Sequence, residues 1–150
     1  MSPEMLFQVA NIVPLPFWLL MIFAPTWSVT RRLMQTHLAP GLFAALYAAL
    51  VIPALPSILP ILAKPDFDII RAELGKPMGF VVAWIHFLTF DLFVGRWIYL
   101  DSRERGVSVW LTGPCLFLTL MFGPLGFLCY LGARQSVKSS ATADPTPRAF

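Results

Sequence analysis

Long apolar runs separated by short polar stretches dominate the chain. A membrane-spanning helix needs about 20 consecutive, mostly apolar residues, and four runs of this chain reach that length. We therefore predict an all-α integral membrane protein, with four transmembrane helices in one domain (residues 1–134) and both termini on one side. The expected spans are residues 6–28, 41–63, 78–100 and 109–133.

Prolines interrupt several of these runs. Proline removes a backbone donor and kinks or ends a helix, so we expect a kink near Pro14–Pro16 and an irregular or strongly kinked segment after Ile52. The Gly123–Pro124 step should bend the fourth span or widen it locally. Between the second and third spans, Asp66 can cap a short helix that stops at Gly75.

Composition supports a lipid environment for the domain. Hydrophobic residues make up 57% of the chain and charged residues 13%, whereas soluble domains average about 25% charged. The net charge of +3 is small, and the basic residues lie at segment ends, which excludes a nucleic-acid footprint. They balance almost evenly between the two sides and slightly favour cytoplasmic termini. Residues 135–150 are rich in Ser, Thr, Ala and Pro and predict a disordered tail.

The third predicted span carries ionisable side chains within its apolar run. Asp91 lies near the middle of that run, with His86 before it and Arg96 after it. An ionisable group at this depth costs about 2.5–3.5 kcal/mol on insertion scales and usually faces a bundle interior, where it finds a partner. We therefore expect function in this span.

Helical geometry separates these side chains. Each residue turns by about 100°, so His86 and Asp91 lie about 140° apart. Gly95 shares the face of Asp91 and lets a neighbouring helix or a ligand approach it. Asp91 either holds the bundle together through an ion pair or hydrogen bond, or takes part in function. Arg96 either reaches the interface as an anchor or pairs with Asp91 or Asp101.

The span holds no familiar catalytic motif. The chain has only two histidines, and it lacks an HExxH, Walker or GxSxG pattern. What remains is acid–base chemistry in a dry pocket, for which we expect neither a metal nor another cofactor. The candidate catalytic residues are His86, Asp91 and Arg96. The candidate substrate-binding residues are Asn11, Trp84, Phe90 and Trp97, although such side chains more often serve helix packing.

A longer series of residues carries a family resemblance. Its strongest part is Ala83-Trp84-Ile85-His86, followed by Asp91-Leu92-Phe93, Arg96, Asp101, Cys115-Leu116, Gly123-Pro124 and Gly126. Earlier parts are Leu15-Pro16-Phe17, Ala24-Pro25, Thr30 with the basic pair that follows it, Met34 and Tyr47. Over roughly residues 6–134 the chain resembles the abscisic-acid-deficient-four-like membrane proteins of plant neoxanthin synthesis.

This resemblance implies a function as well as a four-span fold. Plant members are needed to convert violaxanthin into neoxanthin, a reaction that opens an epoxide and removes a ring-adjacent proton without net redox change. By resemblance, this chain would bind or isomerise a carotenoid-like isoprenoid within membrane lipid. His86 and Asp91 would then handle protons, and Arg96 would be their electrostatic partner. A plastid transit segment is missing, which predicts a location in the bacterial plasma membrane.

Two other functions stay open. In a non-enzymatic scaffold or accessory subunit, Asp91 and Arg96 would only hold helices together, and a homo-oligomer or a membrane partner protein would complete the assembly. In a small oligomeric transporter, activity would follow an ion or proton gradient. An Asp91→Asn change separates enzyme from scaffold, since it abolishes conversion in the first and destabilises the bundle or loses a partner in the second.

Overall fold

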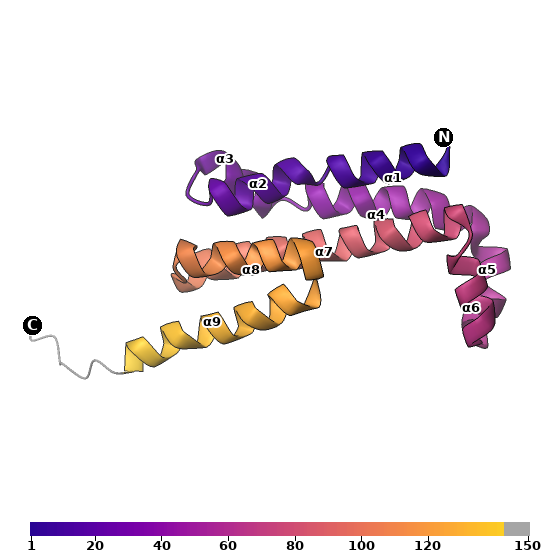
Figure 1. Cartoon of the computed structure of the whole chain (residues 1–150). Helices are drawn as coiled ribbons and strands as arrows, with labels where there is room; N and C mark the ends of the chain where they lie inside the picture. Colours follow the sequence, from indigo (N-terminus) through magenta and orange to yellow (C-terminus); the bar gives the residue numbers. More distant parts are fainter. Residues whose placement is uncertain (143–150) are drawn as a thin grey trace, which may run out of the picture.

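The structure is a computed structural model that describes residues 1–142, with side chains through residue 135. Helices form almost all of this part of the chain, and the long ones lie side by side in an elongated bundle (Figure 1). The elements are α1 (Pro3–Ile12), α2 (Leu15–Phe23), α3 (Ser28–Gln35), α4 (Leu38–Val51), the 3₁₀ turn η1 (Ile52–Ala54), α5 (Leu55–Ala63), α6 (Phe67–Leu74), α7 (Pro77–Arg105), α8 (Val109–Phe122) and α9 (Pro124–Thr142).

The first span is broken where its prolines predict. Helix α1 ends at Ile12 and α2 begins at Leu15, with Pro14 between them as the cap of α2. The predicted kink near Pro14–Pro16 is therefore confirmed. The two helices still follow one another along the bundle, and together they cover Pro3–Phe23, long and apolar enough to cross a membrane.

A short helix replaces the first predicted loop. We expected residues 29–40 to be a connector, but Ser28–Gln35 forms α3. Two hydrogen bonds hold the turn before it: the Thr30 hydroxyl donates to the Ala24 carbonyl at 2.8 Å, and the Tyr99 hydroxyl donates to the Pro25 carbonyl at 2.7 Å. These bonds satisfy carbonyls that the prolines and the turn leave without helical partners.

The second span begins as a regular helix and changes direction at its prolines. Helix α4 gives way at Ile52 to η1 and then to α5, which turns away from the bundle axis (Figure 1). The strongly kinked end that we expected after Ile52 is confirmed, although the chain stays helical. Helix α6 is confirmed as well: the Asp66 carboxylate accepts from the N–H groups of Asp68 and Ile69, and Gly75 ends the helix.

Helix α7 is the longest element, with 29 residues or about 44 Å. It extends past the predicted end at residue 100 because the charged residues there suit a helix end. Arg105 lies one turn from Asp101 and binds it at 2.7 Å, which supports helix. The helix stops at Gly106, whose φ of +69° is the left-handed conformation typical of helix ends.

The predicted fourth span is wrong. Residues 109–133 do not form one crossing, because the chain reverses at Gly123 and α9 returns beside α8 (Figure 1). Gly123 has φ of +43°, which favours glycine, and Pro124 starts a new helix without needing an N–H partner. Helix α8 has 14 residues, or about 21 Å, which is too short for a hydrocarbon core of about 30 Å.

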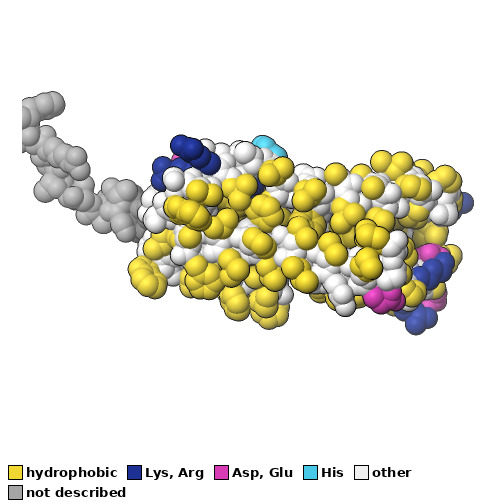
Figure 2. Space-filling view, turned by 90° about the horizontal axis from the view of Figure 1, so that it is seen from above, with side chains coloured by type: hydrophobic (Ala, Val, Ile, Leu, Met, Phe, Trp, Pro, Cys, Tyr) yellow, Lys and Arg dark blue, Asp and Glu magenta, His cyan; other side chains and the backbone are white. Residues whose placement is uncertain are grey.

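Within residues 1–142, three helical segments are long and apolar enough to cross a membrane: Pro3–Phe23, Leu38–Ala63 and Pro77–Arg105. Helix α1 begins at one end of the bundle and α9 runs toward the other (Figure 1), so the four-span prediction that placed both ends of the chain on one side is not supported for the described residues. Hydrophobic side chains cover the middle of the visible surface, and charged side chains gather at its ends (Figure 2).

The predicted tail begins later than residue 135, because α9 continues to Thr142. Residues 143–150 of that prediction lie outside the described residues.

Two clusters of buried side chains divide the bundle. The larger lies where α2, α8, α9 and the second half of α7 meet, and it includes Trp18, Tyr99, Leu116 and Tyr130. The smaller joins α1 to the first half of α7 through Leu6, Ala10, Val81 and Ile85.

Candidate functional site

A groove of about 460 Å³ opens between α4, η1, α5, α6 and the first half of α7. It forms because α5 and α6 turn away from the bundle and leave one side of α7 uncovered. Aliphatic side chains make up most of its wall, which suits an apolar ligand. The residues that line it are Tyr47, Leu50, Val51, Ala54, Leu55, Ser57, Ile58, Ile61, Leu62, Ile70, Glu73, Leu74, Lys76, Met78, Gly79, Val82, Ala83, His86 and Phe87.

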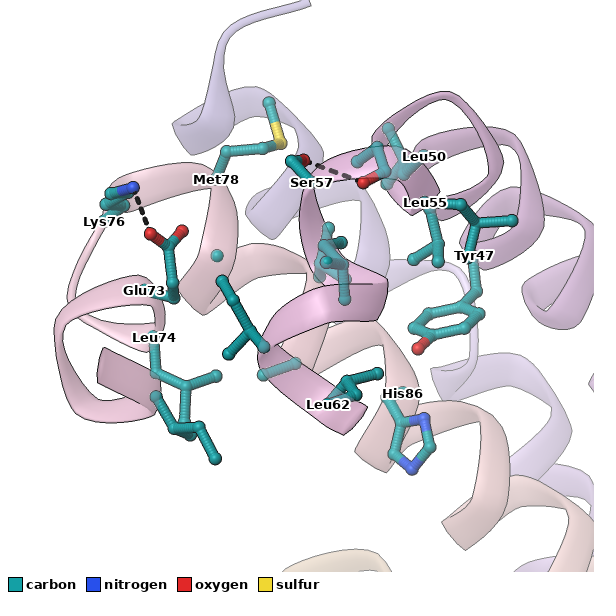
Figure 3. Close-up of a pocket in the computed structure, with 18 of the residues that line it drawn as sticks. Tyr47, Leu50, Leu55, Ser57, Leu62, Glu73, Leu74, Lys76, Met78 and His86 are labelled. Atoms are coloured by element: carbon teal, nitrogen blue, oxygen red, sulfur yellow. Dashed lines mark hydrogen bonds and ion pairs between the residues drawn. The ribbon is translucent and has the colours of Figure 1, made fainter. Parts of the chain in front are cut away.

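The deep end of the groove is marked by two polar aromatic side chains, Tyr47 and His86 (Figure 3). Their ring centroids are 5.4 Å apart, and Leu62 lies beside them. Phe90 packs on the imidazole with a centroid distance of 4.8 Å. His86 itself is exposed. An imidazole and a phenol can each donate and accept hydrogen bonds.

The other end of the groove is charged. Glu73 at the end of α6 pairs with Lys76 just before α7 (Figure 3). From Lys76 to His86 the groove follows ten residues of α7, or about 15 Å, which is half the thickness of a hydrocarbon core. A ligand that fills the groove would therefore have one end near the membrane surface at Lys76 and its other end at His86.

A second, shallower hollow of about 240 Å³ continues along the same α4–α7 seam. Its lining residues are His37, Pro40, Gly41, Ala44, Thr89, Phe90 and Phe93. Phe90 belongs to this hollow and also touches His86, so the imidazole lies between the two hollows. The predicted substrate-binding residue Phe90 is thus exposed on the surface that an apolar ligand would meet.

Asp91 lies at a different place from His86. It is the central residue of α7, half-buried, and its carboxylate faces the α8–α9 turn: a Cβ added to Gly123 would lie 2.5 Å from the Asp91 carboxylate. Asp91 lines neither hollow. Among the described residues it has no hydrogen-bond or ion-pair partner, so the structure does not show the pair that one of the two interpretations of Asp91 required. The structure does not bring His86 and Asp91 together.

Gly95 allows the close approach that we expected, but a protein side chain makes it. Trp18 of α2 packs directly on Gly95, where a Cβ would overlap its indole ring. The position is therefore filled by helix packing.

Arg96 pairs with neither predicted carboxylate. It is buried, and its guanidinium donates to the carbonyls of Thr36 at 2.8 Å and Gln35 at 3.3 Å. Those carbonyls belong to the end of α3 and the turn after it, where helical partners run out. Arg96 thus anchors α3 to α7, and its geometry shows an anchoring role with no contact to the groove.

The remaining predicted binding residues lie in helix contacts. The Trp84 indole N–H donates to the Asn11 side-chain oxygen at 3.1 Å, which joins α7 to α1. Trp97 packs on Phe127 and Tyr130 of α9. None of Asn11, Trp84 and Trp97 lines either hollow, so the structure brings only His86 and Phe90 of the predicted set to the groove surface.

Two polar features were missed from the sequence. Tyr47 is the one side chain of α4 with a polar group, which is the signal that could have found it. The second feature is a network at the end of α7, where Asp101 accepts from the Tyr130 hydroxyl at 2.7 Å, binds Arg105, and lies 3.7 Å from Arg134. Tyr130 is 29 positions away in the sequence, so only the reversal at Gly123 brings it back.

Comparisons with known proteins identify the family of the chain. Residues 5–130 match the family described as ABA DEFICIENT 4-like. The chain belongs to this family. It is similar to Protein ABA DEFICIENT 4, chloroplastic, of Arabidopsis thaliana, with 29% identity over 139 residues. The match covers 89% of this chain and 62% of the relative, so the chain spans about three fifths of the relative's length. No solved structure matches.

The site offers acid–base and hydrogen-bonding groups on an apolar wall. Within the described residues, no group of three or more His, Cys, Asp or Glu side chains converges as metal ligands do. The chemistry that the groove itself supports is therefore binding of an apolar ligand, with proton transfer or hydrogen bonding at Tyr47 and His86.

Proposed function

We propose that this ABA DEFICIENT 4-like protein binds a carotenoid-like isoprenoid from the membrane in the groove along the α4–α7 seam. The observation that carries the proposal is the groove itself: a long, mostly aliphatic surface with Tyr47 and His86 at its inner end. Isoprenoids are apolar rods with bulky end groups. Such a groove would bury the rod against aliphatic side chains while the end group contacts the two polar rings.

The same pair suits the isomerisation that the family resemblance implies. The Tyr47 hydroxyl would donate its proton to an epoxide oxygen as the carbon–oxygen bond breaks. His86 would remove the ring-adjacent proton, and its return to the Tyr47 oxygen would restore both side chains. One proton enters the product and one leaves, so no oxidant or reductant is needed. Asp91 would act indirectly, through the position of the α8–α9 turn.

Pigment analysis tests the binding step. The protein would be purified in mild detergent from a bacterial host that makes epoxy-carotenoids, and bound pigment measured per chain. Near-stoichiometric carotenoid is the expected result. Pigment-free protein that remains folded in the same membranes would overturn the proposal.

A matched pair of alanine substitutions controls this experiment. Ala54 lines the groove, whereas Ala49 is exposed on α4 and lines neither hollow. Ala54→Phe should fill the groove and lose most of the pigment, while Ala49→Phe should keep it. Equal pigment in the two variants would place the ligand elsewhere.

One observation favours a scaffold as the second candidate. Only 6% of the most apolar window of Leu38–Ala63 is buried, against 28% and 22% for the other two spans. A partner protein or second copy covering that face would explain this difference. Cross-linking from an exposed position of α4 in native membranes, with a partner chain recovered in place of pigment, would support it.

A further inference from the structure

The two ends of the bundle differ in charge. At the end formed by α3, the last turn of α7 and α9, the side chains that the structure describes, which extend to residue 135, include five arginines and two acidic residues, Asp101 and Glu104. We call this set the arginine rim. Its members are Arg31, Arg32, Arg103, Arg105 and Arg134.

The opposite end is close to neutral. Its basic side chains are Lys64, Arg71 and Lys76, and its acidic side chains are Glu4, Asp66, Asp68 and Glu73. Two ion pairs, Arg71–Asp68 and Lys76–Glu73, neutralise most of the positive charge there. Figure 2 shows acidic and basic side chains together at that end, on the right of the view.

The reversal at Gly123 increases this imbalance by one arginine. If residues 109–133 crossed the membrane, Arg134 would lie at the near-neutral end, where basic and acidic side chains are almost equal in number. The hairpin instead brings Arg134 back beside Asp101, 3.7 Å away, and its guanidinium lies over Trp97. Arg31 and Arg32 are exposed and have no ion-pair partner among the described residues.

Exposed tryptophans mark the same end. Trp27, just before α3, is 54% exposed, and Trp110, in the first turn of α8, is 85% exposed. Tryptophan is enriched where hydrocarbon meets the headgroups. Arginines just beyond such a belt lie at the level of lipid phosphates.

We propose that the arginine rim binds acidic phospholipid headgroups of the cytoplasmic leaflet and thereby sets the orientation of the chain. The positive-inside rule places the arginine-rich end in the cytoplasm. The N-terminus and the charged mouth of the groove at Glu73–Lys76 then lie at the opposite leaflet. Apolar ligands would enter the groove from that outer leaflet.

Cysteine labelling in a bacterial inner membrane tests the orientation. Ser28→Cys reports the rim end and Ala72→Cys the opposite end, and both positions are exposed. Neither substitution changes the charge that sets the orientation. A membrane-impermeant maleimide should label Ala72→Cys in intact cells and Ser28→Cys only after permeabilisation, with the unsubstituted protein as the blank. The reverse pattern, or equal labelling of both, would overturn the proposal.

Lipid titration tests the headgroup contact. Phosphatidylglycerol added to protein in mild detergent should raise the melting temperature more than phosphatidylcholine does. The double variant Arg31→Gln/Arg32→Gln should need at least about ten times more phosphatidylglycerol for the same rise in melting temperature. Arg71→Gln at the opposite end should leave the required concentration unchanged. Equal responses to the two lipids, or equal loss in the two variants, would show that the rim does not bind acidic headgroups. Both tests are independent of any ligand in the groove.

Discussion

The two halves of the bundle are built differently. The body comprises α2, α3, the start of α4, the second half of α7, α8 and α9, and it buries large side chains such as Trp18, Tyr99 and Tyr130 almost completely. The arm comprises α1, the rest of α4, α5, α6 and the first half of α7, and it has a small core and leaves the groove open. One helix, α7, belongs to both.

This difference indicates which part of the bundle depends on close packing for its stability. Lipid tails are as apolar as the side chains, so helices in a membrane associate through close contact and hydrogen bonds rather than through the hydrophobic effect. The body uses both, with small residues at its contacts and hydrogen bonds across helices. In the arm, α1, α4 and α6 also pack on α7, but α5 and α6 diverge from the bundle and leave an apolar surface for a lipid-soluble ligand.

The largest effect should come from filling the tightest contact of the body. A Cβ at Gly126 would overlap the Thr119 backbone and lie 2.6 Å from the Cys115 carbonyl oxygen. Gly126→Ala should therefore lower the free energy of unfolding by about 3 kcal/mol, measured by thermal or denaturant unfolding in mild detergent.

Gly132 provides the control on the same helix. A Cβ there would meet nothing within 4 Å, so Gly132→Ala should be neutral or stabilise by up to about 1 kcal/mol. Similar destabilisation by both alanines would mean that helix α9 does not pack on α8 through Gly126.

Removing the Arg96 guanidinium should have the next largest effect. Arg96→Met leaves the Gln35 and Thr36 carbonyls without these donors and should lower the free energy of unfolding by about 2 kcal/mol. Arg71→Met, which removes an exposed pair, should change it by less than about 0.5 kcal/mol. If Arg96→Met unfolds like the native chain yet loses activity, Arg96 has a role in chemistry instead.

Local sequence signals predicted the arm well. Pro14, Ile52, Asp66 and Gly75 each act through backbone geometry or capping within a few residues, so the kinks and α6 could be predicted. Gly123–Pro124 carries the same kind of signal, and the sequence indicated a bend there. The angle of that bend depends on contacts that α9 makes after turning back, such as Gly126 on Thr119. A local pattern does not contain that information.

The candidate site was predicted only in part, because local patterns do not contain the contacts between residues that are distant in the sequence. Apolar context and helical spacing identify α7 and place His86 and Asp91 on different faces. They do not say which face a neighbour covers. The turn of α5 leaves His86 exposed, whereas α3 supplies the carbonyls that bind Arg96. The pairing of residues distant in the sequence, such as Tyr47 with His86, becomes visible only in the fold.

An intermediate effect should appear in the arm. His86→Ala should weaken retention of a bound carotenoid about tenfold, or about 1.4 kcal/mol, without changing unfolding, because the side chain is exposed. Phe117→Ala removes a side chain that is 53% exposed on α8 and should change neither. A parallel loss of pigment in both variants would point to nonspecific lipid replacement.

The smallest expected effect concerns the boundary between the two halves. It compares substitutions of two carboxylates of α7, Asp91 and Asp101. Asp91 is half-buried and has no hydrogen-bond or ion-pair partner among the described residues, so Asp91→Asn, which removes an unpaired charge, should leave the free energy of unfolding unchanged or raise it. Asp101 binds Tyr130 and Arg105, so Asp101→Asn should lower it by about 1 kcal/mol or more. Unfolding in mild detergent measures both. If Asp91→Asn proves the more damaging, Asp91 holds the hairpin in place, and the body reaches further along α7 than its contacts indicate.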